Sequence, residues 1–362
     1  MVTVLEANGT QPRAQVPARY LGSASCSSSS CHGGAGERRN QSIIWSQQDF
    51  HVKASLILTN ARSSQIAQSL GIQNAATSQR CTVCHSPLAT IPQTRLARSD
   101  QRDEGVACES CHGPAGPWLR SHTRRDYTYA MRVSSGLRDL RNIYVRANAC
   151  VACHQVVDPQ ITASGHPPLF FELATQMKFE PPHWRELGES PVKTWLTGQA
   201  SALRELSWND REGYKSDSVG DASRQRAGLA WLLAKVTAAD TSLPKILEDG
   251  NISIMQQTAD ELARSASARD FDHSYAWKVV RVLASTGNDF TGVALSSQDV
   301  LYYRAKRLVL GFQALISRDD SIADSSELRQ LIADVTSLSG FEPKRFVQHL
   351  ESFRLSLEAA HR

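Results

Sequence analysis

The eight cysteines of this chain form four close pairs, and a histidine follows every pair at once. Three pairs have the form C-x-x-C-H, and the first has the wider form C-x4-C-H. The cysteines are Cys26, Cys31, Cys81, Cys84, Cys108, Cys111, Cys150 and Cys153, and the histidines are His32, His85, His112 and His154. Because the chain has only 11 histidines in 362 residues, chance does not explain this arrangement.

Three kinds of chemistry use paired cysteines. C-x-x-C-H is the attachment motif of c-type haem, in which both thiols bond to the porphyrin and the histidine ligates the iron. Pairs of C-x-x-C also build four-cysteine zinc sites, but a zinc site leaves the histidines without a role. A disulfide framework explains neither the spacing nor the histidines. The pattern therefore predicts four covalently attached haem c groups.

The haem motifs also predict where the protein works. Covalent haem attachment takes place outside the cytoplasm in bacteria, so we expect a periplasmic or otherwise exported protein. The first residues, MVTVLEANGTQPR, show neither the basic region nor the apolar stretch of a signal peptide. We therefore expect that an export signal has been removed or the start misassigned, and the prediction of export rests on the haem motifs alone. No apolar run approaches the roughly 18 residues that span a bilayer, which predicts no transmembrane segment.

Composition and charge fit this chemistry. With 41% hydrophobic and 21% charged residues, the chain is not intrinsically disordered. The first 185 residues carry a net charge of +7, and 17 of their 19 basic residues are arginine. Arginine binds carboxylates bidentately and suits the propionates of haem. Since the propionates would offset this charge, nucleic-acid binding is not expected.

Histidines outside the motifs are candidate sixth ligands of the irons. A second histidine gives a low-potential electron carrier, whereas an open position allows ligand chemistry. The candidates are His51, in a segment over residues 46–60 that we expect to be helical, His122, in a turn rich in glycine and proline, and His166 and His183, each next to prolines. The remaining three are expected to have no functional role: His273 before a helical stretch, His349 at the edge of an apolar stripe, and His361 in the terminal tail.

From about residue 20 to residue 184 the chain resembles the tetrahaem cytochrome c-554 family of nitrifying bacteria and its multihaem relatives. The matching segments are the first motif followed by DFHVKA, then CTVCH, EGVACESCHGPAGPWLRSH and CVACH. The string GVACESCHGPAG is the most specific of these. The segments ASGHPPLFFELA and PPHW are similar to those of a wider group of multihaem proteins.

This resemblance implies a set of sixth ligands. His51 would serve the fourth haem, His122 the first, and either His166 or His183 the third. The second haem, on His85, would be five-coordinate. Two features depart from the family pattern: the first motif is wider, and Pro159 stands where relatives often have a further histidine. The second departure favours one open or otherwise ligated haem.

The remainder of the chain, residues 186–362, contains no cysteine. Its apolar residues recur at helical spacing. This pattern predicts helices over 192–206, 222–238, 254–266, 300–316, 328–338 and 346–357. The predicted fold class is mainly α with irregular loops. We expect an N-terminal tail over 1–20, a tetrahaem cytochrome c domain over 21–185, and an α-helical domain of unknown role over 186–362.

The sequence favours an exported tetrahaem cytochrome that transfers single electrons between redox partner proteins through mostly bis-histidine haems. The alternative is a haem enzyme that acts on nitric oxide, hydroxylamine or nitrite at an open haem on His85. The chain has no C-x-x-C-K motif, which counts against a nitrite reductase of the pentahaem type. A zinc or disulfide protein, in contrast, would be colourless.

Overall fold

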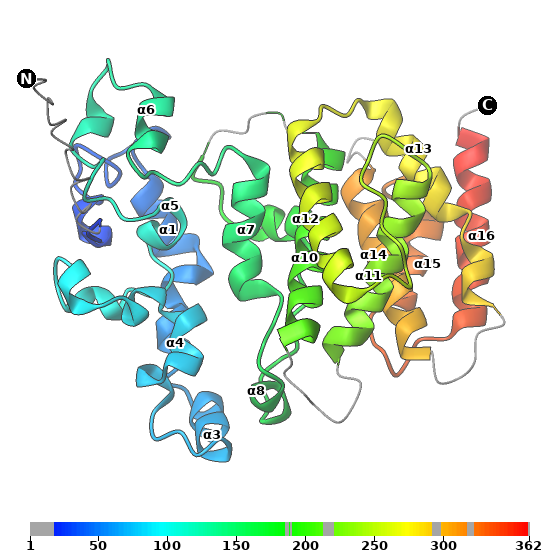
Figure 1. Ribbon diagram of the computed structural model, residues 1–362, viewed down its shortest axis with the longest axis horizontal. Helices are drawn as coiled ribbons and strands as arrows, with labels where there is room; N and C mark the ends of the chain where they lie inside the picture. Colours follow the sequence, from blue (N-terminus) through cyan, green and yellow to red (C-terminus); the bar gives the residue numbers. More distant parts are fainter. Residues whose placement is uncertain are drawn as a thin grey trace, which may run out of the picture.

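The fold is built from helices. A computed structural model describes residues 18–184, 188, 190–212, 221–291, 298–316 and 322–360 (Figure 1). Within these ranges the β structure is a single isolated bridge between Tyr20 and Leu96. The mainly α fold class predicted from the sequence is therefore confirmed.

Short helices, joined by loops and 3-10 turns, make up the part of the chain that carries the cysteine motifs. They are α1 (Gln41–Gln48), α2 (Ala54–Ile57), α3 (Ala61–Ser69), α4 (Gln79–His85), α5 (Cys108–His112), α6 (Tyr129–Ser134), α7 (Ile143–His154), α8 (Pro159–Ala163) and α9 (Leu173–Phe179). The helices α4, α5 and α7 each end at the histidine of a motif. Residues three apart lie on one helix face, so each helix presents both thiols of its motif on the same side.

Longer helices form a bundle in the second half. They are α10 (Pro191–Glu212), α11 (Asp221–Ala238), α12 (Ile252–Ala268), α13 (His273–Ala284), α14 (Gln298–Leu315), α15 (Ser326–Asp334) and α16 (Pro343–Ala360). The six helices predicted from apolar spacing are all present. The predicted helix over 328–338 ends earlier, at Asp334, because Val335 leaves the helical conformation, with φ −104° and ψ 15°.

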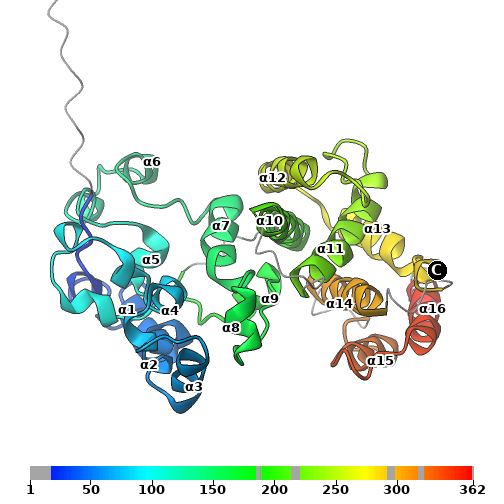
Figure 2. The same cartoon turned by 60° about the horizontal axis from the view of Figure 1, so that its bottom comes forward.

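One continuous apolar core fills the bundle and reaches beyond it. It includes large side chains such as Trp195, Trp231 and Phe312, and also Ala147 and Val151 from α7. Figure 2 shows α7, α8 and α9 between the other motif-bearing helices and the bundle. The packing of α7 thus crosses the domain boundary expected after residue 185, and the division into two domains stays a prediction.

The motif-bearing part has little apolar core of its own. Its separate buried cluster consists of Leu58, Ala67 and Ala75. Among the described helices, none combines the length and the apolar character that a membrane span requires.

Candidate haem-binding site

Three pairs of histidine rings lie close together in the structure. Each pair joins a motif histidine to one from a distant part of the chain: His32 to His122 with ring centroids 6.2 Å apart, His51 to His154 at 5.9 Å, and His85 to His166 at 6.2 Å. Two imidazoles bound on opposite sides of one metal by bonds of about 2 Å have centroids roughly 6 Å apart. The spacing therefore fits one iron between the rings of each pair.

A fourth association involves the third motif. Burial, and after it the nearby charge of His183, lower the pKa of His112 to about 4. The His183 ring also contacts Trp184, with centroids 5.1 Å apart. The structure thus brings His183 near the third motif and His166 opposite the second.

The Nδ1 atoms of seven of these histidines have polar partners. The partners are Gln41 Oε1 for His32 (2.9 Å), Asp49 Oδ1 for His51 (3.0 Å), Ala54 O for His85 (3.1 Å), Leu119 O for His122, Gln176 Nε2 for His154 (3.4 Å), Pro167 O for His166 (2.8 Å) and Pro181 O for His183 (3.3 Å). Six of these partners are acceptors, so Nδ1 carries the proton and donates it. The Nε2 lone pair is then free to bind a metal.

The seventh partner, Gln176, also becomes an acceptor when its side-chain amide is flipped by 180°. Its Oε1 is buried and has no hydrogen-bond partner, while its Nε2 lies 3.4 Å from Nδ1 of His154. The two ends of an amide have the same shape, and their placement follows from the hydrogen bonds they can make. Exchanging them gives Oε1 a donor and leaves the Nε2 of His154 free, as in the other six histidines.

His51 has a carboxylate partner. The hydrogen bond to Asp49 raises the pKa of His51. Burial would raise the pKa of Asp49, but its hydrogen bonds with His51 outweigh burial and lower it. Ligand atoms of Asp49, His51 and Glu180 lie within 4.8 Å of one another. Since His51 points Nδ1 at Asp49, its Nε2 stays available toward His154.

The cysteine geometry does not fit a zinc site. All eight cysteines are free thiols. Among the described residues, the group of three or more potential metal ligands is Asp49, His51 and Glu180, and it contains no cysteine. The cysteine pairs therefore do not converge as a four-cysteine zinc site requires.

A carboxylate inside the third motif ties this motif to the chain before the first. Glu109 is buried and accepts hydrogen bonds from the N–H groups of Leu21 and Gly22, the shortest of them 2.6 Å long. It also accepts one from Ala115 N–H at 2.6 Å. Glu109 thus fixes the approach to Cys26, a role that the sequence pattern gave no means of recognising.

The segment around His51 is not the continuous helix expected over residues 46–60. Helix α1 ends at Gln48, and Asp49 adopts an extended conformation in which its side chain accepts from the N–H of His51. This cap starts a separate 3-10 turn, Phe50–Lys53, in which His51 lies. The Asp-x-His spacing therefore interrupts the helix and directs the imidazole.

Gly105 lets a second segment approach this turn closely. Val106 N–H donates to His51 O at 3.0 Å, and Gly105 has a φ of +71°. A Cβ at Gly105 would lie 2.7 Å from His51 O. Only glycine meets both conditions without strain.

His166 reaches the second motif because of its flanking backbone. Gly165 has a φ of +108°, and its carbonyl accepts two hydrogen bonds from the guanidinium of Arg62 on α3, at 2.7 and 3.0 Å. The prolines that follow keep the chain extended. The geometry differs here from the open second haem that the family resemblance implied, because His166 lies opposite His85 rather than beside His112.

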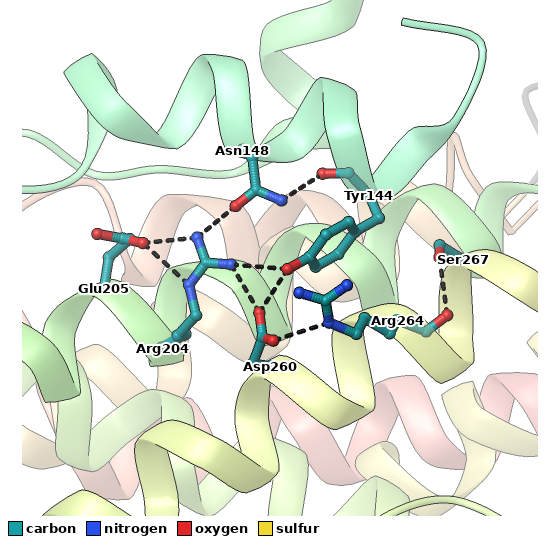
Figure 3. Close-up of polar contacts among 7 residues, drawn as sticks. All are labelled: Tyr144, Asn148, Arg204, Glu205, Asp260, Arg264 and Ser267. Carbon is teal, nitrogen blue, oxygen red and sulfur yellow. Dashed lines mark hydrogen bonds and ion pairs between the residues drawn. The ribbon is translucent and has the colours of Figure 1, made fainter. Parts of the chain in front are cut away.

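The fourth motif is anchored to the bundle by the polar network in Figure 3. Tyr144 on α7 donates to Asp260 on α12 at 2.7 Å, and Arg204 on α10 donates to the same carboxylate at 2.8 Å. Arg204 also donates to Asn148, one turn further along α7. Burial would raise the pKa of Asp260, but these hydrogen bonds lower it to about 2.

With this geometry in place, comparison with known proteins adds one match. Residues 25–113 match the family described as cytochrome c554 and c-prime. Over this stretch, the chain is similar to c-type cytochromes. The match includes the first three motifs and confirms the resemblance found in the sequence, and it implies covalently bound haem c. No curated protein and no solved structure matches the chain.

A further feature of the chain fits haem. Large apolar side chains near its motifs are exposed: Phe50 is 79% exposed, Leu56 66% and Val83 52%. Exposed apolar groups beside cysteine motifs, together with the small apolar cluster of this part, fit a core completed by porphyrin faces.

The three histidines expected to have no functional role lie away from the ring pairs or outside the described residues. His349 Nδ1 contacts Asp334 Oδ2 at 2.7 Å and so joins α16 to α15. His273 begins α13 next to its capping residue, Asp272. His361 lies outside the described residues.

Proposed function

We propose that this protein is a c-type cytochrome that carries four covalent haems and passes single electrons between redox partner proteins. The observation that supports it most strongly is the pairing of histidine rings at the spacing of a bis-histidine iron, with Nδ1 engaged and Nε2 free. In the proposal, each cysteine pair binds one haem and the following histidine is its proximal ligand. Haem supplies one-electron chemistry at its iron.

The proposed axial pairs use all eight histidines of the site. They are His32 and His122 for the first haem, His85 and His166 for the second, His112 and His183 for the third, and His154 and His51 for the fourth. Ligation by two histidines keeps iron low-spin in both oxidation states, so reduction changes little geometry. The pairs thus favour fast electron transfer.

Contacts between motifs support an order for the haems. The thiol of Cys108 in the third motif lies close enough to that of Cys26 in the first to lower the pKa of Cys26. Cys111 of the third is close enough to Cys150 of the fourth to raise its pKa, after the larger effect of burial. Cys153 of the fourth motif lies close enough to Cys84 of the second to lower the pKa of Cys84. These contacts support a row in the order first, third, fourth, second.

The position of His166 argues for a carrier over an enzyme. Catalysis on nitric oxide, hydroxylamine or nitrite needs an iron with an open position, and His85 was the candidate for it. Because the His166 ring lies 6.2 Å from that of His85, the second iron would have both axial positions filled. The proposal therefore contains no substrate site.

We also propose that the protein works outside the cytoplasm, in the periplasm or an equivalent compartment, because covalent haem attachment takes place there. Its partners would be electron donor and acceptor proteins.

Haem counting tests the proposal. The full chain, produced with a c-type haem maturation system, should gain the mass of four haems. Replacing both cysteines of one motif with alanine should remove one haem. A redox titration should then account for four electrons per chain. Fewer than four haems in the unaltered chain, or fast nitric oxide binding to one ferrous haem, would contradict it.

A further inference from the structure

We propose that the C-terminal helical bundle positions His166 on the second haem, through the strap formed by residues 167–172. This inference rests on the proposed function, because it takes His85 and His166 to be the axial ligands of that haem. It gives residues 186–362 a role that no sequence motif indicates.

Two side chains of the bundle bind the backbone of the strap. Arg307 on α14 donates from Nη1 to Phe171 O at 2.5 Å. Gln225 on α11 donates from Nε2 to Leu169 O at 3.1 Å. The two carbonyls lie three and five residues after His166, so the bundle fixes the chain immediately beyond the ligand.

One of the strap's two phenylalanines, Phe170, packs against α14. The guanidinium of Arg307 lies 3.8 Å from the ring centroid of Phe170, and the ammonium of Lys306 lies 4.5 Å from it. The ring of Tyr303 stacks on Phe170 with centroids 6.4 Å apart. Cations above an aromatic face are attracted by its quadrupole, and this attraction strengthens when the groups are desolvated.

The far end of the strap is joined to α10. Glu172 is buried, caps α9 by accepting from Thr175 N–H at 2.6 Å, and accepts from Gln199 Nε2 at 3.3 Å. The next residue, Leu173, packs against Gly198, where a Cβ would come within 2.6 Å of the Leu173 Cβ. The strap therefore has no freedom to slide along the bundle.

Burying the charged side chain of Arg307 costs free energy, which a purely structural role does not require. Its side chain is fully buried, and its Nε and Nη2 have no hydrogen-bond partner in the described structure. Burial lowers its pKa to about 9, and the charge of Glu172 opposes this effect, so Arg307 stays charged at neutral pH. An apolar residue of similar size fills such a site at lower cost. What arginine adds is the hydrogen bonds to Phe171 O and Gln199 Oε1 and the contact with Phe170.

On its other side, His166 is held by the hydrogen bonds from Arg62 to Gly165 O. The ligand thus lies between an anchor on α3 and an anchor on the bundle. Releasing the strap removes one anchor and lets His166 leave the iron.

The test compares two arginines of α14. Arg307→Met keeps a similar volume and removes the hydrogen bonds to Phe171 O and Gln199 Oε1. Arg304→Met, the control, removes a partner of Glu248 in the bundle. In the four-haem protein we expect Arg307→Met to turn about one quarter of the ferric iron high-spin in low-temperature EPR. Arg304→Met should stay low-spin, and Arg307→Lys should restore part of the low-spin signal. A folded Arg307→Met protein with only low-spin iron would overturn the proposal.

Two further variants test the ligand assignment and replace Arg307→Met if that variant does not fold. His166→Ala should give the same high-spin fraction directly; if it leaves the spectrum unchanged, the ligand assignment itself fails. If Arg307→Met does not fold, Gln225→Leu decides, because it removes the bond to Leu169 O of the strap while the contacts of Arg307 remain. The change also removes the bonds of Gln225 with Gln155 and Asp221. A high-spin fraction in Gln225→Leu supports the proposal, and a wholly low-spin spectrum overturns it.

Discussion

Asp49 Oδ1 lies 3.0 Å from Nδ1 of His51. Among the described residues of the four proposed pairs, His51 is the histidine that has a carboxylate at Nδ1. The other Nδ1 atoms described above have backbone carbonyls or side-chain amides as partners. A carboxylate makes imidazole a stronger electron donor than a neutral acceptor does. The fourth haem should therefore have a lower reduction potential than its otherwise similar neighbours.

Replacing Asp49 with asparagine should raise the potential of one haem. Losing the anionic partner destabilises the ferric state, and a tenfold change in the redox equilibrium corresponds to about 59 mV for one electron. We expect a rise on the order of 60 mV in one of four steps of a spectroelectrochemical titration. Asp126→Asn, which affects an exposed ion pair with Arg124, is the control and should leave all four steps in place. Equal titrations for both variants would contradict the assignment.

Gly105→Ala should weaken the ligation by His51. A methyl group there meets His51 O at 2.7 Å and forces a left-handed conformation on alanine. We expect a loss of about 1–3 kcal/mol in the free energy of unfolding and some high-spin iron. Gly71→Ala is the matched control, because its φ is +66° but nothing lies within 4 Å of the new Cβ. Identical behaviour of the two variants in thermal unfolding and EPR would exclude the close approach as the reason for Gly105.

Glu109→Ala should loosen the first haem site from the third. The change leaves the N–H groups of Leu21, Gly22 and Ala115 without their acceptor. Unsatisfied buried donors cost about 1–3 kcal/mol each, less whatever water recovers. We expect a loss on the order of 3 kcal/mol, measured by denaturant unfolding of the four-haem protein with far-UV circular dichroism. Glu109→Gln, which keeps an acceptor, should recover part of it, and an unchanged midpoint for Glu109→Ala would refute this role.

Asp260→Asn should destabilise the protein in a pH-dependent way. The folded-state pKa of Asp260, about 2, lies below the ordinary value of 3.8. A depressed carboxyl pKa stabilises the fold above the unfolded-state value, and the stabilisation is lost as pH falls through the folded-state value. We expect a loss on the order of 1–2 kcal/mol at pH 7 that fades between about pH 4 and pH 2. A loss that is the same at pH 7 and pH 2.5 would show that the charge of Asp260 does not contribute.

Much of the site was predictable because haem attachment is local in the sequence. Two cysteines and a histidine at fixed spacing identify a proximal site, and apolar periodicity located the bundle helices. The ligand opposite each proximal histidine is a long-range contact, and sequence spacing does not report it. His166 and His85 are paired by two hydrogen bonds from Arg62 and by a strap that the bundle holds.

Two supporting residues, Glu109 and Arg307, could not be recognised from the sequence, and the reason is physical. Glu109 and Arg307 are charged residues, which are normally expected at the surface. Both are buried because they bind backbone groups of distant segments. The break at Asp49 shows the same limit at short range, since a side-chain cap overrode a helical pattern.

Low-temperature EPR of the ferric four-haem protein tests the central claim most directly, with haem and iron counted on the same sample. The account predicts four low-spin signals and no high-spin iron, because each proximal histidine has a second histidine opposite or beside it. High-spin signal from about a quarter of the iron would reveal an open haem and contradict the pairing of His85 with His166. Absence of haem would contradict the whole account.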